Sequence, residues 1–229
     1  APSRFLAQMF VSRGGLSPDR IRYLRYGLDS GTGERPSLPE GNRRRGLRVG
    51  YLGQIAPHKG VHVLVEAFRS LDVSDGACEL RIYGDMGRFP RYAERLRRLA
   101  QGDPRIQFEG AVDNRRVPEV LSGLDVLVVP SIWYENSPLT ILEAHAVGVP
   151  VLASDLGGMA EMVRHGVDGL LFRMGDAQDL AARLRELAEN PDLPPRLRAG
   201  IGPVWTLEQE REQLMEIYRE AVRLREVRR

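Results

Sequence analysis

From Leu47 onward, short apolar runs alternate with longer segments of helical periodicity. The strand-like runs are Arg48–Leu52, Cys78–Tyr83, Ile106–Phe108, Asp125–Val129, Val149–Ala153 and Gly169–Phe172. Helical runs lie between them, at residues 60–71, 90–101, 115–123, 138–147 and 158–164. Because strands separated by helices of this length pair in parallel, the alternation predicts an α/β domain with helices on both faces of one sheet. Ligands of such sheets bind beyond the carboxyl ends of the strands.

The segments outside this alternation are less regular. Residues 3–14 read as a short helix, and Ile21–Tyr26 reads as a strand. Residues 30–45 are rich in Gly, Pro and Ser and end in three arginines, which predicts a linker with a solvated basic end. Helical patterns return at residues 176–189, at 194–200 and from 207 to the end.

The totals exclude several classes of protein. The 229 residues are 42% hydrophobic and 28% charged, as is usual for a globular domain that can bury a good core. A net charge of +2 is too small to predict a nucleic-acid or anionic-membrane partner. No apolar run reaches membrane-spanning length. The single cysteine, Cys78, excludes an internal disulfide, and we expect it to be a small core residue of a cytoplasmic protein.

Lysine is confined to one position. Of the 33 basic residues, only Lys59 is a lysine, and it lies in the turn between the first strand and its helix. An ammonium is a compact point charge and an arginine a planar fork, so the two differ as phosphate ligands. Chance could leave one lysine anywhere, but its place in the Gly53–Gly60 turn favours a phosphate site formed by backbone and ammonium together.

A second anion site is predicted within the segment 130–146. Ser137 reads as the N-cap of a helix and Pro138 as its first residue. The backbone donors of residues 139–141 would then have no partner inside the helix, and the helix dipole would add to their attraction for an anion.

Two carboxylates flank this helix start, Glu135 before it and Glu143 within it. At about 100° per residue, Glu143 lies on the apolar face of the helix beside Leu142 and Ala146. An unpaired carboxylate buried there would cost several kcal/mol. The spacing leaves two readings open, a carboxylate that reaches water at the rim of this face and one that binds a ligand.

Other motifs are weaker. Glycine turns follow two further strands, at Gly84–Gly87 and at Gly157–Gly158, but neither is a P-loop or a GxGxxG turn. Together with the first turn and the helix start, they describe a pocket for an anionic, hydroxyl-rich ligand. Of the four histidines, His58 lies beside Lys59 and could touch that ligand. The remaining three read as structural or surface residues: His62, His145 and His165. No cluster has metal-ligand spacing.

In this order, the motifs resemble a known family. Glu135 and Glu143 enclose seven residues, the E-x7-E pattern of retaining glycosyltransferases of the GT-B fold, and the chain most resembles family 4, group 1. Supporting pieces occur in family order over roughly residues 1–190: Ala1-Pro-Ser-Arg-Phe5, Gly27-Leu-Asp29, Gly50-Tyr-Leu-Gly-Gln54, Lys59-Gly60, Ile82-Tyr-Gly-Asp85, Phe108-Glu-Gly110, Pro130-Ser131, Glu143-Ala144, Gly148-Val-Pro-Val151, Gly157-Gly158 with Glu161, and Asp168-Gly169.

The resemblance implies a Rossmann-like domain that holds a nucleotide-diphosphate sugar. It implies that Lys59 and Glu135 are the catalytic residues, Lys59 at the diphosphate and Glu135 at the hydroxyls of the transferred sugar. Glu143 would hold the ribose hydroxyls. The donor-binding set is Gly53, Gln54, Lys59, Gly110, Val112, Glu135, Asn136, Ser137, Leu139, Thr140 and Glu143. Gly110 to Val112 would meet the base mainly through backbone atoms. No cofactor and no metal are expected.

The resemblance has one departure and one gap. The family often has arginine where this chain has Gln54, so one cationic phosphate ligand is missing. GT-B enzymes also have an N-terminal, acceptor-binding domain, to which only residues 1–40 could belong. The division expected is a remnant at 1–40, the donor-binding domain at 41–200 and a crossover helix at 201–229. Such a donor half is not expected to transfer sugar alone, and peripheral membrane contact would come through the missing half.

The sequence permits comparison with two other functions. A nucleotide or nucleotide-sugar binding module without catalytic activity would use the same residues. Only an assay of sugar transfer would distinguish it from the enzyme. A dehydrogenase-like dinucleotide domain is disfavoured because the GxGxxG turn and its acidic partner are absent from the sequence.

Overall fold

One parallel sheet forms the centre of the molecule. The computed structural model describes residues 1–29, 46–72 and 78–227. Its six strands run in the order β3-β2-β1-β4-β5-β6, and every neighbouring pair is parallel. They are β1 (Leu47–Leu52), β2 (Cys78–Tyr83), β3 (Ile106–Gly110), β4 (Val126–Val129), β5 (Val151–Ser154) and β6 (Gly169–Phe172). The order reverses between β1 and β4, which is where doubly wound sheets bind ligands.

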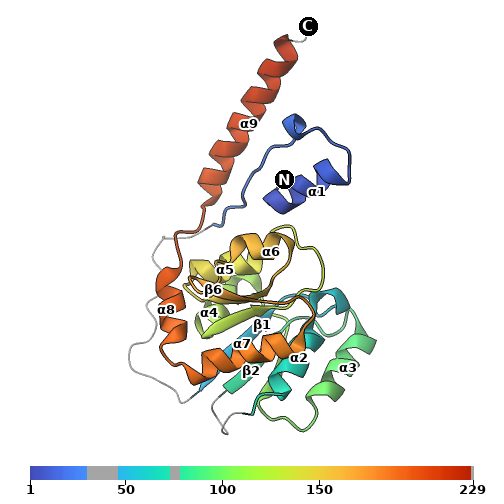
Figure 1. The fold of residues 1–229 in the computed structure, drawn as a ribbon, viewed down its shortest axis with the longest axis vertical. Helices are drawn as coiled ribbons and strands as arrows, with labels where there is room; N and C mark the ends of the chain where they lie inside the picture. Colours follow the sequence, from blue (N-terminus) through green and yellow to red (C-terminus); the bar gives the residue numbers. More distant parts are fainter. Residues whose placement is uncertain (30–45, 73–77, 228–229) are drawn as a thin grey trace.

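Helices cover both faces of the sheet (Figure 1). On one face lie α2 (Val61–Arg69), α3 (Pro90–Ala100), α7 (Ala177–Glu189) and α8 (Leu193–Gly200). On the other lie α4 (Val117–Ser122), α5 (Leu139–Ala146) and α6 (Gly157–Met162). Each face buries its own apolar cluster, with Phe68 and Leu184 in one and Leu127 and Ile141 in the other. The central strands are buried on both sides, as their continuous apolar runs predicted.

The predicted elements of residues 47–200 are confirmed, with ends that shift by up to two residues. The helix predicted at 115–123 begins as a 3-10 turn, η3 (Asn114–Arg116), and continues as α4. The strand predicted from Val149 begins at Val151, because Pro150 has no N–H to give to the sheet. Cys78 is buried, as expected. The basic linker at 30–45 lies outside the described residues.

The strand predicted at Ile21–Tyr26 is wrong. This segment is extended, but no strand of the sheet lies beside it. It bonds instead to the N-terminus, where Leu24 N donates to Ala1 O at 2.9 Å and the Ala1 amino group donates to Arg22 O at 2.6 Å. An alternating pattern forms a strand only where a partner strand exists.

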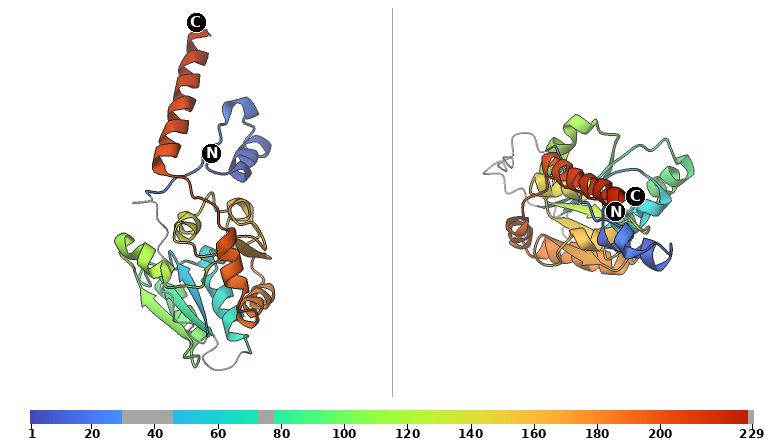
Figure 2. Two further views of the ribbon diagram at one scale, coloured as in Figure 1. Left: turned by 90° about the vertical axis from the view of Figure 1, so that its left-hand side faces the viewer. Right: turned by 90° about the horizontal axis from the view of Figure 1, so that it is seen from above.

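The N-terminal segment and the C-terminal helix α9 lie on the same side of the sheet, beyond it (Figures 1 and 2). Helix α1 (Arg4–Ser12) packs on α6, and Glu161 of α6 accepts hydrogen bonds from Arg4 N, at 2.9 Å, and from Phe5 N. Helix α9 (Leu207–Val227) extends away from the domain. At its base, Leu28 N donates to Trp205 O at 2.9 Å and Leu207 N donates to Leu28 O at 3.0 Å.

Helix α9 is long but highly charged. No helix in the described part of the chain is both long and apolar enough to cross a membrane.

Candidate functional site

Two loops at the carboxyl ends of β1 and β4 are joined by backbone contacts. Gly60 has φ +69°, and a Cβ there would lie 1.8 Å from Pro130 O, so only glycine lets the β1–α2 turn approach the β4–α5 loop this closely. The carbonyl oxygen of His58 accepts from Ile132 N at 3.0 Å and lies 3.1 Å from the Ser131 hydroxyl. These contacts fix the turn that carries Lys59.

Lys59 and Glu135 meet across this junction. Lys59 Nζ donates to Glu135 Oε1 at 2.6 Å, and the Ser131 hydroxyl lies 2.8 Å from the same oxygen. The side chains are 29% and 14% exposed, so the pair is partly shielded from water yet open to a ligand. The prediction that residues 76 positions apart converge on one site is confirmed for this pair.

The glycine pair at 157–158 supports the same loop rather than facing the site. Gly158 N donates to Glu135 O at 3.2 Å, and a Cβ on Gly158 would lie 2.1 Å from Asn136 O. Gly157 has φ +55° and lies against the ring of Phe5. The third turn of the predicted pocket therefore holds the backbone of Glu135 and Asn136 in place.

A cavity of about 340 Å³ opens beside this junction, over the ends of β1 and β2. We call it the Glu143 cavity. Five residues predicted to bind the donor line it: Gly53, Gln54, Val112, Thr140 and Glu143. The glycine turn after β2 was also predicted to contribute, and it lines the cavity through Gly84 and Asp85. Arg88, which follows this turn, lines the cavity as well.

Glu143 is half-buried and lines this cavity. No group among the described residues donates a hydrogen bond to its carboxylate. Burial raises the pKa of Glu143 above its usual value, because the charged form loses hydration without gaining a partner. A half-buried carboxylate that faces a cavity without a partner is suited to accept hydrogen bonds from ligand hydroxyls.

The start of α5 differs from the prediction. Pro138 is extended, with ψ 118°, so it is the N-cap and Leu139 is the first helical residue. Ser137 is therefore not the cap, and its hydroxyl lies 3.4 Å from Met162 Sδ. Ile141 N is not free either, since it donates to Pro138 O at 3.1 Å. The amides of Leu139 and Thr140 remain without a partner among the described residues.

Two further predicted site residues, Gly110 and Ser137, do not line the Glu143 cavity. Gly110 has φ +81°, and its carbonyl oxygen accepts from Gly84 N at 2.7 Å, which places Ala111 and Val112 at the cavity wall. Ser137 lines a separate cavity beneath residues 2–26, bounded by α5, α6 and the segment 202–205.

The four histidines lie in different surroundings. His58 is half-buried and makes an edge contact with the exposed ring of Trp133, 6.1 Å between centroids. His62 Nδ1 lies 2.9 Å from the Tyr92 hydroxyl, and His165 Nδ1 accepts from Leu171 N at 2.9 Å. His145 is buried within α5. Within the described ranges, no three His, Cys, Asp or Glu side chains are grouped to hold a metal ion.

Arg88 is the charged residue of the cavity lining that sequence reasoning missed. It lies five residues beyond β2, one residue after the glycine turn that the sequence pointed to. The turn was a signal that this loop reaches the site, but nothing in the spacing indicated which of its side chains turns inward.

The chain also resembles proteins of known class. Residues 46–190 match the family model described as glycosyl transferases group 1. It is 32% identical to the amylovoran biosynthesis glycosyltransferase AmsK of Erwinia amylovora over 170 residues, which cover 70% of this chain and 40% of AmsK. The chain spans about half or less of the curated relatives it matches.

Solved structures share the fold. A glycosyltransferase of Rickettsia africae superposes with a TM-score of 0.84 at 21% identity, over 97% of this chain and 62% of that one. The Anabaena protein HepE, crystallised with UDP-glucose, superposes with a TM-score of 0.80 at 21% identity, over 96% of this chain and 63% of HepE. The family match covers more than half of the chain and includes both ends of the E-x7-E pattern. The chain therefore belongs to the group 1 glycosyltransferases, of which it comprises the Rossmann-like, C-terminal half of a GT-B fold.

Proposed function

We propose that this chain binds a nucleoside-diphosphate sugar and supplies the donor half of a retaining glycosyltransferase. The observation that carries the proposal is the junction of the Lys59–Glu135 pair with the Glu143 cavity. One turn, Gly53 to Gly60, contributes to both, and one helix, α5, follows Glu135 and carries Glu143. A cation, two free amides and two carboxylates would thus face a single elongated ligand.

The diphosphate of that ligand would lie between Lys59 and the start of α5. Lys59 has a carboxylate partner in the free protein, but a phosphate can take over one of its three donors. The free amides of Leu139 and Thr140 add a positive helix end. As the bond to the sugar breaks, negative charge grows on the leaving diphosphate, and these fixed donors stabilise it without rearranging.

The carboxylates of Glu135 and Glu143 would accept hydrogen bonds from sugar hydroxyl groups at the two ends of the diphosphate. Glu135, held by Ser131 and Lys59, would accept hydrogen bonds from the transferred sugar. Glu143 lies in the cavity, where ribose hydroxyls would give its carboxylate the partners that it lacks. The base would then lie against Ala111 and Val112, largely on backbone atoms.

The remaining parts of the proposal concern the whole enzyme. HepE was crystallised with UDP-glucose, which supports a nucleotide sugar as the ligand here. The chain spans only 40% of AmsK, so we propose that transfer needs an acceptor-binding half and that this chain alone is inactive. We expect that neither a metal nor a cofactor is required, because fixed cations and amides offset the leaving charge, and that the enzyme acts in the cytoplasm.

Calorimetric titration with UDP, GDP, ADP and their sugars tests this proposal. We expect one diphosphate to bind, and the matching nucleotide sugar to bind with a further gain that depends on Glu135. Absence of binding by all of them would count against the proposal. A binding module without chemistry remains the second candidate, because it would hold the nucleotide sugar with the same residues. Sugar transfer after the N-terminal half is added would exclude it.

A further inference from the structure

Arg88 is held in the Glu143 cavity by a neutral partner. The carboxamide of Gln54 lies against its guanidinium, and with the amide oxygen toward Arg88 it accepts from Nε at 3.0 Å and from Nη1 at 2.7 Å. Both residues line the cavity, and Arg88 is the one basic side chain among the described residues that do so. Because an amide carries no charge, it orients the guanidinium without neutralising it.

The backbone of Gln54 is itself held in place by buried and neighbouring groups. The hydroxyl of Tyr51, a residue 3% exposed, donates to Gln54 O at 2.7 Å. Gly53 N donates to Tyr83 O at 3.1 Å, which ties the same turn to the end of β2. A buried tyrosine therefore holds the Gln54 backbone, and the Gln54 side chain holds Arg88.

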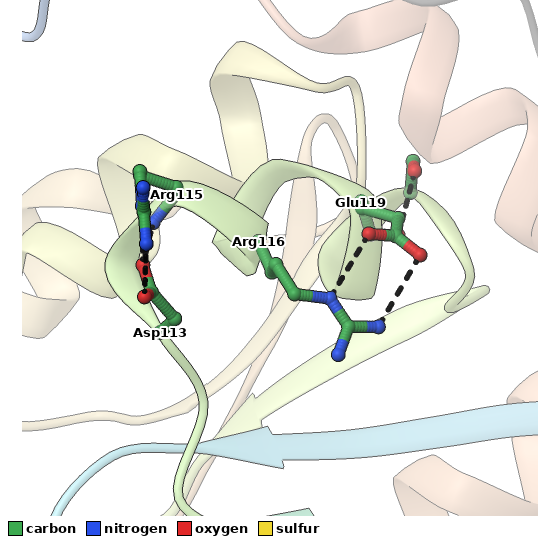
Figure 3. Close-up of polar contacts among 5 residues, drawn as sticks. Asp113, Arg115, Arg116 and Glu119 are labelled. Carbon is green, nitrogen blue, oxygen red and sulfur yellow. Dashed lines mark hydrogen bonds and ion pairs between the residues drawn. The ribbon is translucent and has the colours of Figure 1, made fainter.

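Neighbouring arginines are placed differently. Figure 3 shows Arg115 and Arg116 at the start of α4, next to the cavity residues Asn114 and Val117. Arg115 pairs with Asp113 at 2.9 Å, and Arg116 pairs with Glu119 at 3.2 Å. Arg88 makes no such pair with any carboxylate of the described residues.

The carboxylate nearest in sequence is Asp85, which also lines the cavity. Its Oδ1 accepts from Gly87 N at 2.7 Å, so it closes its own turn. Arg88 is an exposed residue, and its guanidinium keeps donors for an anion that enters the cavity.

We propose that Arg88, positioned by Gln54, binds the diphosphate of the donor nucleotide and acts there as a second cation beside Lys59. This inference rests on the proposed function, since it assigns a further ligand to the same site. The loop after β2 adjoins the turn at Gly53 and also bonds, from Gly84 N to Gly110 O, to the wall that ends at Val112. A guanidinium without a carboxylate partner, beside the turn that leads to Lys59, favours the charged diphosphate over the neutral base.

The test compares a nucleoside diphosphate with its own nucleoside. Affinities of UDP and uridine, GDP and guanosine, and ADP and adenosine are measured by calorimetry for the wild type and for Arg88→Ala. For the pair that binds, we expect Arg88→Ala to weaken the diphosphate about tenfold, the worth of one charge-assisted hydrogen bond, and to leave the nucleoside unchanged. Arg91→Ala, which removes an exposed arginine outside the cavity lining, is the matched control and should change neither.

Variants of Gln54 test the positioning. Gln54→Glu keeps the shape but places a carboxylate on Arg88, so it should weaken the diphosphate as much as Arg88→Ala does. Gln54→Arg combined with Arg88→Ala moves the cation to the other partner and should recover most of the lost affinity. Thermal unfolding of each variant checks that the domain remains folded.

The outcomes separate the two proposals. If no nucleotide binds the wild type, the proposed function fails and this inference fails with it. If a diphosphate binds and Arg88→Ala binds it equally well, the proposed function stands and the role of Arg88 is refuted. Equal losses for diphosphate and nucleoside would also refute it, because the contact would then be to the base or to the fold.

Discussion

Removing the charge of Glu135 should strengthen the binding of a free diphosphate. In the unliganded protein Lys59 Nζ lies 2.6 Å from Glu135 Oε1, so a phosphate must compete with this carboxylate. Glu135→Gln keeps the volume and a hydrogen-bonding oxygen for Ser131 but ends the competition. A partly exposed ion pair is worth up to about 1 kcal/mol, so the gain should be about fivefold in diphosphate affinity.

Removing Lys59 should have the opposite effect. Lys59→Ala deletes a charge-assisted contact worth about 1.5–3 kcal/mol, which is roughly 10- to 150-fold in diphosphate affinity. It also leaves Glu135, 14% exposed, without its cation. We expect a cost of about 1 kcal/mol in stability, and for a chain of this size about 2–4 °C in the unfolding temperature.

Calorimetry with the diphosphate and with the nucleotide sugar distinguishes the two roles. Glu135→Gln should bind the diphosphate more tightly but should lose the extra affinity that the sugar provides. Glu94→Gln on α3, 65% exposed, is a matched control for the loss of one acidic charge. If Glu135→Gln weakens the diphosphate, or if Lys59→Ala leaves it unchanged, Lys59 does not exchange its carboxylate for phosphate and the reasoning is refuted.

Three further outcomes follow from the structure. Because burial raises the pKa of Glu143, the protonated carboxyl favours the folded state, and that stability is lost as pH rises from the unfolded pKa through the raised one. Glu143→Gln should therefore unfold at a higher temperature than the wild type at pH 7, with an advantage that shrinks toward pH 4, while nucleoside binding weakens. Gly60→Ala should cost more than 2 kcal/mol, since about 1 kcal/mol of backbone strain adds to the clash with Pro130 O. Gly102→Ala, at φ +82° with nothing nearby, should show the strain alone in the same denaturant titration. Glu161→Ala should release the start of α1, and limited proteolysis should then cut residues 1–20 faster while the sheet stays intact.

The sheet could be predicted because its signals are local and strong. Short apolar runs such as Val126–Val129 are typical of strands in a parallel sheet, where helices cover both faces and bury every side chain of the strand. Lys59 and Glu135 could be brought together because parallel strands end at one edge. The ends of the helices and strands could not be predicted as well, because one residue can often suit two neighbouring positions. A proline at φ −62° suits either the N-cap or the first helical turn, so Pro138 and Ser137 could not be told apart from sequence.

The features that the sequence did not predict depend on contacts between residues far apart in the chain. The pattern at Ile21–Tyr26 is that of a strand, yet its backbone bonds to the N-terminal residue instead of to a sheet. The orientation of the Arg88 guanidinium depends on Gln54, which is 34 positions away and is placed by a buried hydroxyl. A single sequence contains no signal for such a contact.

The hydrogen bonds between Leu28 and residues 205–207 have a mechanical consequence. They join the N-terminal segment and the base of α9, and Gly27 N adds a bond to Glu210 Oε2 at 2.8 Å. A Cβ at Gly27 would lie 2.2 Å from Thr206 O, so the two backbones touch there. Any swing of α9 relative to the sheet must therefore pull residues 27 and 28 with it, and a force applied to either end of the chain is passed to the other at this crossing.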